Sequence, residues 1–227
     1  MNTQKSAFRA AFPLTLPVLA GYLMLGMAYG ILMSEKGFPF YWTLIMSSVV
    51  FAGALQYASI TLLLSAFDPL TAFILALLVN IRHLFYGIAL LEKFKGLHGK
   101  FFLVYGMADE AFSINATVNP PDTVRPHHFY LWTTGLCYLY WQVSCLSGHL
   151  IGGFIPDSIQ GFDFVLTALF FVMFLNQWST PSNRKTLLLG VGMTLLALVV
   201  FPRAQFLLGA MVLIIVGLFV LERKVNA

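Results

Sequence analysis

Long apolar runs follow one another along the chain and are separated by short polar loops. Most of the runs come close to the roughly 20 residues that a helix needs to cross a bilayer. They form eight segments, at 13–33, 40–66, 69–91, 101–118, 127–155, 162–178, 185–202 and 204–221. The pattern therefore predicts an all-α, polytopic transmembrane helical bundle of about seven or eight membrane segments.

Composition strengthens this prediction. Of the 227 residues, 59% are hydrophobic and only 10% are charged, and the mean hydropathy is +0.83. Soluble domains carry about 25% charged residues, so this chain lacks the polar surface that a water-exposed globule needs. The length leaves no room for an extramembrane domain, and residues 1–227 are expected to form a single transmembrane domain. The net charge of +4 is spread over loops, which argues against nucleic acid as a partner and leaves the lipid bilayer.

Positive charge in the short loops indicates how the segments are oriented. Lys and Arg cluster at 5–9, 93–100, 184–185 and 223–224, whereas the loops at 67–69 and 156–161 have none. Eight simple crossings would place 93–100 on the side opposite to 5–9, against the positive-inside rule. The conflict disappears if segments 40–66 and 101–118 do not cross fully, which would place all four clusters and both termini in the cytoplasm. Both topologies stay open at this point.

Segment 40–66 is long for one crossing helix and short for two. The stretch "AGALQYA" lies around its centre and contains Gly53. Irregular backbone is tolerated at membrane depth where it lines a cavity, so we expect a broken or re-entrant helix near Gly53.

Four polar side chains lie near the middle of their segments: Gln56, Arg82, Asp109 and Glu110. A charge at the bilayer centre costs about 2.5–3.5 kcal/mol on insertion scales, and such groups face the bundle interior and find partners. Segments 40–66, 69–91 and 101–118 are therefore expected to surround one polar cavity.

Helical spacing divides the polar residues between faces. In "VNIRHLFYG", Asn80 lies roughly opposite Arg82, so a regular helix cannot aim both at one ligand. In "MADEAFSI", Asp109 and Glu110 diverge by about 100° and flank Ser113. One acid is the natural partner of Arg82, and the other is a candidate proton carrier because desolvation favours its neutral form. A static buried ion pair that fixes helix register is the alternative.

Two small-xxx-small pairs, "GMAYG" (Gly26 and Gly30) and "GHLIG" (Gly148 and Gly152), predict close helix packing. The chain shows no HExxH, no G-x-S-x-G and no Gly-rich phosphate loop with Lys. We therefore expect no enzyme activity, no metal and no cofactor, and transport is the better class.

Three polar stretches, "FAGALQYASITLL" at 51–63, "LVNIRHLFYG" at 78–87 and "MADEAFSI" at 107–114, occur in this order. With the early "FPLTLPVLAGYLMLGMAYGILMSEKGF", they resemble the AzlC family, the large subunit of branched-chain amino-acid exporters linked to azaleucine resistance. The resemblance is strong over roughly residues 10–120. It implies a multi-pass protein of the bacterial plasma (inner) membrane that exports leucine, isoleucine, valine or other small neutral amino acids. It also implies proton coupling and a small hydrophobic AzlD-like partner subunit.

These expectations combine into one hypothesis for the site. The substrate carboxylate would meet Arg82 or the backbone N–H groups near Gly53, where the helix dipole favours an anion. The ammonium group would meet Asp109 or Glu110, which would also exchange the coupling proton. Gln56, Asn80 and Ser113 would complete the polar wall. The alternative is a membrane scaffold subunit that does not itself transport.

Overall fold

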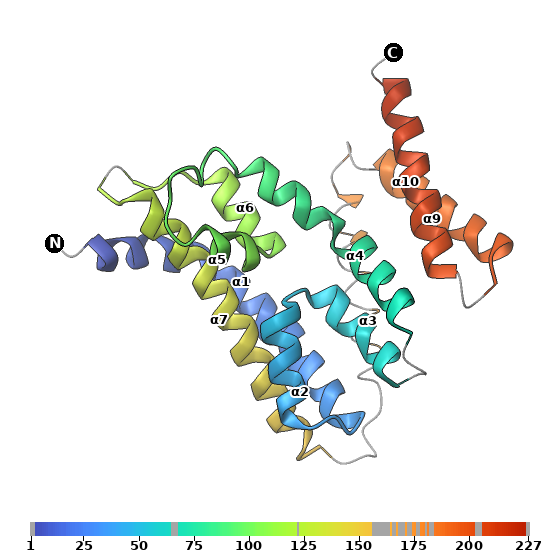
Figure 1. Cartoon of the computed structure of the whole chain (residues 1–227), viewed down its shortest axis with the longest axis horizontal. Coiled ribbons are helices and arrows are strands. Elements are labelled where there is room, and N and C mark those ends of the chain that lie inside the picture. The colour runs from blue at the N-terminus through green and yellow to red at the C-terminus, as the bar shows by residue number, and fades with distance from the viewer. Residues whose placement is uncertain are drawn as a thin grey trace. The chain divides into compact units, whose positions relative to one another are not determined.

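The computed structural model describes residues 3–64, 68–121, 123–155, 184–202 and 206–225, with single positions between 164 and 181. Every regular element in these ranges is a helix (Figure 1). The chain forms two compact units, Met1–Asp163 and Phe164–Ala227. The predicted segment 162–178 falls almost wholly outside the described residues, so the count of seven or eight segments stays a prediction.

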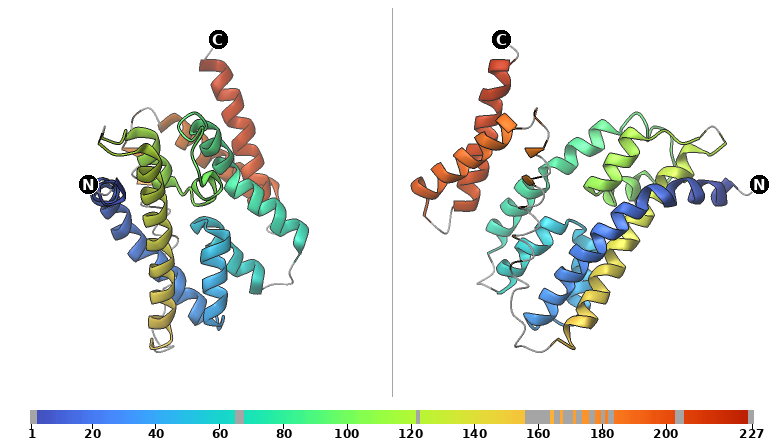
Figure 2. Two further views of the ribbon diagram at one scale, coloured as in Figure 1. Left: turned by 60° about the vertical axis from the view of Figure 1, so that its left-hand side comes forward. Right: turned by 180° about the vertical axis from the view of Figure 1, so that it is seen from behind.

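Three long helices frame the first unit: α1 (Thr3–Glu35), α4 (Pro69–Ala89) and α7 (Pro126–Gly152). Helices α1 and α7 lie side by side along their lengths (Figures 1 and 2). The ring of Phe8 packs on Trp132 where both helices begin, and Gly152 lies against Ile31 where both end. They therefore run in parallel, and we call these two ends of the unit the N-terminal end and the opposite end.

The two predicted small-xxx-small pairs form the contact between α1 and α7. A Cβ added at Gly26 would lie 2.6 Å from the Cβ of Ser144, and one at Gly30 would clash with the carbonyl oxygen of Cys145. A Cβ at Gly148 would likewise clash with the backbone of Met27. The prediction of close packing is confirmed, because only glycine lets these backbones approach so closely.

The segment after α1 is interrupted and turns back on itself. Its first arm is α2 (Phe40–Ile45) continued by a π-turn, η1 (Met46–Val50), and its second arm is α3 (Gly53–Leu64). Between them Phe51 has the left-handed φ of +38°, which stops the helix. The ring of Phe40 contacts His149 at the opposite end, with centroids 5.5 Å apart.

The α3 arm returns toward that same end. The Tyr57 hydroxyl donates to the carbonyl of Leu25, and its ring packs on Tyr29, farther along α1. Figures 1 and 2 show α2 and α3 diverging from one tip. The α2 and η1 arm is about 16 Å long, near half of the roughly 30 Å hydrocarbon thickness. We call this unit the first hairpin and residues 51–52 its tip.

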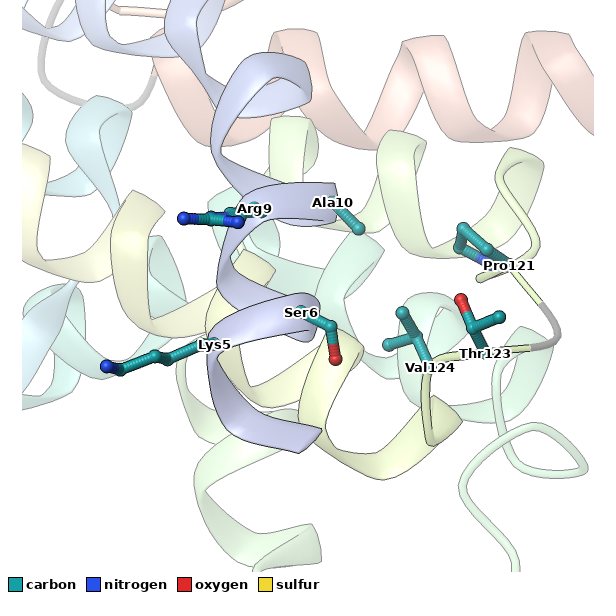
Figure 3. A pocket seen from close by; sticks show the side chains of 7 residues that line it. All are labelled: Lys5, Ser6, Arg9, Ala10, Pro121, Thr123 and Val124. Atoms are coloured by element: carbon teal, nitrogen blue, oxygen red, sulfur yellow. The ribbon is translucent and has the colours of Figure 1, made fainter. Parts of the chain in front are cut away.

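The segment after α4 forms a second hairpin that enters from the N-terminal end. Its arms are α5 (Lys100–Tyr105) and α6 (Asp109–Thr117), and residues 106–108 are its tip. Just before α5, the ring of His98 lies 6.2 Å from that of His127 at the start of α7. After α6, residues 121, 123 and 124 and the first turns of α1 line a pocket of about 430 Å³ (Figure 3).

Figure 3 also shows that side chains from the first turns of α1 extend in two directions at this pocket. Ser6 and Ala10 point toward Thr123 in the loop, whereas Lys5 and Arg9 extend from the other side of α1. Lys5 and Arg9 are both exposed, so this end of the unit presents positive charge outward.

The hairpins resolve the choice between the two topologies for the first unit. Phe94 packs on Tyr130 near the start of α7, with ring centroids 5.5 Å apart. The positive cluster at 93–100 therefore lies at the same end as the cluster at 5–9. Eight simple crossings do not describe this unit, because each hairpin returns to the end from which it came. Of the described helices, Gln4–Glu35 and Pro69–Ala89 are long and apolar enough to span a membrane by length and composition.

The second unit contains α9 (Arg184–Val200) and α10 (Phe206–Val225). Phe201 covers Gly209 where the two helices are joined, and Leu189 reaches Gly217 farther along. The helices are therefore antiparallel neighbours. All the predicted site residues lie in the first unit.

Candidate functional site

The tips of the two hairpins are joined by a tyrosine. Tyr105 is the last helical residue before the second tip, and its hydroxyl donates to the carbonyls of Ser48 and Val49, which lie just before the first tip. Tyr138 of α7 donates to the Ser48 carbonyl as well, at 3.0 Å. Hairpins that enter from opposite ends thus meet in the middle of the unit.

Side chains replace the backbone hydrogen bonds that are lost at the first tip. The last carbonyls of a helix have no partner within the helix and need another donor when they are buried. Gln56 Nε2 donates to the carbonyl of Met46 at 2.7 Å, and Gln142 Nε2 donates to that of Ser47. With the two tyrosines, all four carbonyls from 46 to 49 are satisfied.

Both outward-running arms begin at the meeting point. α3 starts at Gly53 and α6 starts at Asp109, and they run to opposite ends of the unit. In α3 the amide of Gln56 donates to the carbonyl of Ala52, and in α6 the amide of Phe112 donates to that of Ala108. The amides of residues 53–55 and 109–111 come before these helical hydrogen bonds in the chain and lie at the N-terminal ends of the two helices. Two helix N-termini, each with a partial positive charge, therefore face the centre.

The two acids at the start of α6 bind different neighbours. Tyr22 of α1 donates to Glu110 Oε2 at 2.6 Å, and Tyr86 of α4 donates to Asp109 Oδ1 at 2.8 Å. Both acids are partly buried. Their divergence agrees with the helical spacing, and each carboxylate has a neutral hydroxyl donor that a cation could replace.

Tyr22 and Trp141 connect the start of α6 to the start of α3. The ring of Tyr22 meets that of Trp141 edge to face, with centroids 5.1 Å apart. The indole Nε1 of Trp141 donates to Gln56 Oε1 at 2.9 Å. The same indole covers Gly53 so closely that a Cβ there would lie 3.1 Å from it. The site is therefore one contact network across four helices.

The other expected site residues lie around this network in different ways. Val79 packs against the cluster of Ala52, Leu55 and Leu75, which places α4 beside the first hairpin. The neighbouring Asn80 has a buried Oδ1 with no hydrogen-bond partner among the described residues.

Two further residues expected at the site are Arg82 and Ser113. Arg82 lies on α4, but its side chain is outside what the structure describes. Ser113 is exposed on α6. Within the described ranges, no group of three or more His, Cys, Asp or Glu side chains could hold a metal ion.

The sequence reading missed the aromatic members of the network. Tyr22 is close to the middle of the predicted segment 13–33, and Trp141 is at the middle of 127–155. Tyrosine and tryptophan normally gather at the two membrane interfaces, so their placement at mid-depth was an available signal. Tyr138, three residues from Trp141, carried the same signal, and Tyr86 belongs to the polar stretch "VNIRHLFYG" on the face of Arg82. Tyr105 gave no such signal without the fold.

Known proteins have sequences similar to this one over most of its length. Residues 17–155 match the family model described as AzlC protein. That stretch contains both hairpins and the whole contact network. The chain belongs to the AzlC family.

Curated relatives of this AzlC-family chain agree. It is 43% identical over 220 residues to the branched-chain amino acid transport protein AzlC of Bacillus subtilis, covering 96% of this chain and 86% of the relative. It is 33% identical over 227 residues to a membrane protein of Helicobacter pylori, covering 100% of both chains. It is 26% identical over 169 residues to the inner membrane protein YgaZ of Escherichia coli, covering 70% of this chain and 65% of the relative.

No solved structure matches the chain. The membrane relatives and the apolar helices identify this AzlC-family chain as a bacterial membrane protein. This confirms the family and the membrane location expected from the sequence.

Proposed function

We propose that this protein is a secondary exporter of branched-chain and other small neutral amino acids, coupled to protons and working with a small hydrophobic AzlD-like subunit. The family and its branched-chain amino acid transport relative support the substrate class. Discontinuous helices whose N-termini meet at mid-depth are the usual substrate sites of secondary transporters. The observation that carries the proposal is the meeting of two such hairpins beside a pair of acids.

A zwitterionic amino acid suits the charges at this meeting point. Its carboxylate would bind the backbone N–H groups at the start of α3, near Gly53, or Arg82. Its ammonium group would replace a tyrosine hydroxyl on Asp109 or Glu110, because a cation forms the stronger hydrogen bond with a carboxylate. Gln56, Asn80 and Ser113 would bind the remaining polar groups, and Phe and Leu side chains would enclose the aliphatic one.

The same acids would provide proton coupling. A carboxylate that binds either a proton or the substrate ammonium makes the two compete for one place. Export of substrate would then accompany proton entry, since the acid that releases one cation must take up the other before it returns.

Counterflow in proteoliposomes tests the function. The purified protein is reconstituted alone and with its AzlD-like partner, and exchange is measured over a panel of neutral amino acids at two pH values. We expect saturable, pH-dependent exchange of leucine, isoleucine and valine. If neither preparation exchanges them, the proposal is wrong. If only the complex exchanges them, a scaffold role for this chain remains as the alternative, which the site variants below then test.

Two variants then test the site. Asp109→Asn and Glu110→Gln should each lower valine exchange about tenfold or more, because a neutral amide cannot form the charge-assisted hydrogen bond with the substrate ammonium group. Glu35→Gln is the matched control, since Glu35 is an exposed acid at the opposite end that pairs with Lys36 at 3.7 Å. Wild-type exchange by both site variants would remove the acids from the mechanism.

A further inference from the structure

Among the contacts at the site, the one between Tyr22 and Glu110 stands where a substrate cation would bind. We propose that the Tyr22 hydroxyl occupies the position on the Glu110 carboxylate that the substrate ammonium group takes when it binds. Trp141 then transmits the displacement of Tyr22 to the first hairpin. The inference rests on the proposed function and extends it, because it names the residue that detects the substrate and the path by which the tip responds.

The geometry favours Tyr22 over the other tyrosine–acid pair. The ring of Tyr86, which binds Asp109, stacks on Phe112 of α6 with centroids 4.3 Å apart. That pair is therefore anchored on the same helix as the acid. Tyr22 comes instead from a different helix, α1, and donates its hydroxyl to Glu110 at 2.6 Å. A ligand that replaces this hydroxyl would separate α1 from the start of α6.

Tyr22 has little space in which to move without disturbing its neighbours. Its side chain is only 5% exposed, and its ring edge rests on the indole of Trp141. Close-packed interiors transmit such shifts rather than absorb them. A displaced Tyr22 therefore moves Trp141, whose indole N–H is bonded to Gln56 and whose ring covers Gly53.

The path ends on an element that has the features of a switch. Gln56 holds the carbonyl of Met46, the first residue of the π-turn. Single-turn π-helices are frequent at functional sites, and Phe51 beside the turn has a conformation that costs free energy for a residue with a side chain. Because side chains replace backbone partners here, the tip can exchange its hydrogen bonds without unfolding a helix.

The test is Tyr22→Phe, which removes the hydroxyl and keeps the ring against Trp141. If the hydroxyl competes with the substrate, its removal should lower the KM for leucine counterflow by about fivefold, the weight of one hydrogen bond. The maximal rate should fall about tenfold, because substrate binding no longer displaces the ring. A merely structural role predicts the opposite sign for KM, since a damaged site binds more weakly.

Tyr140→Phe is the matched control. Tyr140 is also a buried tyrosine between α1 and α7, and its hydroxyl lies 3.3 Å from Thr15 Oγ1, away from the acids. This variant should keep the wild-type KM and maximal rate. The same change in both variants would assign the effect to helix packing and overturn the inference.

A second variant tests the path independently. Trp141→Phe keeps an aromatic ring beside Tyr22 but removes the donor to Gln56, so it should lower the maximal rate with little change in KM. A wild-type maximal rate in Trp141→Phe overturns the inference, and so does an unchanged or raised KM in Tyr22→Phe. In either case the proposed function stands as long as the wild-type protein exchanges leucine. Absence of leucine exchange by the wild type, alone and with its partner, overturns both.

Discussion

At the scale of single residues, the site is built from hydrogen bonds between polar groups that lie on different helical elements. Gln56 illustrates this: its side chain is fully buried and both ends of its amide are used, one by Met46 and one by Trp141. A residue that holds two structural partners stabilises the site before any substrate arrives. Its proposed contact with substrate would require one of these bonds to open.

Replacement of Gln56 by leucine should strongly destabilise the protein. The change leaves the Met46 carbonyl and the Trp141 indole N–H buried without partners, at a cost of about 1–3 kcal/mol each. We expect a clear fall in the melting temperature of the detergent-solubilised protein. Gln4→Leu makes the same chemical change at an exposed position of α1 and should leave that temperature nearly unchanged. Equal melting temperatures for both variants would contradict the buried role of Gln56.

At the scale of elements, both the close helix pair and the hairpin tips follow from backbone requirements. Glycines allow α1 and α7 to touch, and side-chain donors allow the first hairpin to break. The break is tolerable at depth because each exposed carbonyl finds a donor, which is the condition that lipid imposes on irregular backbone.

The glycine contact predicts a difference between two positions of the same helix. Gly30→Ala places a methyl group against the α7 backbone at Cys145 and should cost about 1–3 kcal/mol through overpacking. Gly21→Ala places its methyl group in open space and should be neutral or slightly stabilising. Thermal unfolding in detergent compares them, and equal stabilities would show that α1 and α7 do not pack through Gly30.

The tyrosine caps predict a local effect at the first tip. The double variant Tyr105→Phe, Tyr138→Phe removes the side-chain donors to the Ser48 and Val49 carbonyls. Amide hydrogen exchange in peptides covering residues 46–56 should then quicken about tenfold or more, while peptides from α7 outside position 138 stay protected. Tyr41→Phe, at an exposed position of α2, is the control. Unchanged exchange at the tip would show that these hydroxyls do not hold it.

At the scale of the whole molecule, two hairpins that enter from opposite ends determine which loops share a side. Each contributes one half-helix whose positive N-terminus faces the centre, so the middle of the first unit is positive from two directions. The acids of α6 offset this charge on one side. In the proposed site, that arrangement would distinguish the two ends of a zwitterion better than a single charged residue could.

The topology predicts the sidedness of two loops. In a variant lacking both native cysteines (Cys137→Ala, Cys145→Ala), a cysteine at Lys95 should react with a membrane-impermeant maleimide only after the cells are permeabilised. A cysteine at Phe154, which is exposed at the opposite end, should react in intact cells. Labelling of position 95 from outside intact cells would overturn the cytoplasmic assignment of the positive clusters.

Several features were predictable because they depend on local spacing or on charge. The helical phase between Asp109 and Glu110 required them to diverge, and the lysines and arginines at 5–9 and 93–100 offered a shared side as one of two topologies. The partners of the acids were less accessible. Arg82, the deep cation, was the natural expectation, and that pairing stays a prediction because its side chain lies outside the described residues. The hydroxyls of Tyr22 and Tyr86, which bind Glu110 and Asp109, could not be assigned to these acids from spacing.

The sequence alone determined the class, the family and the depth of the polar residues, because apolar run length and charge placement act through the local chain. Only the tertiary structure decided that both broken segments are hairpins, that their tips meet through Tyr105, and that Tyr22 and Trp141 link the two half-helix starts. These contacts join residues far apart in the chain. No local pattern specifies them, since a tyrosine in an apolar segment looks the same whether it faces lipid or a buried carboxylate.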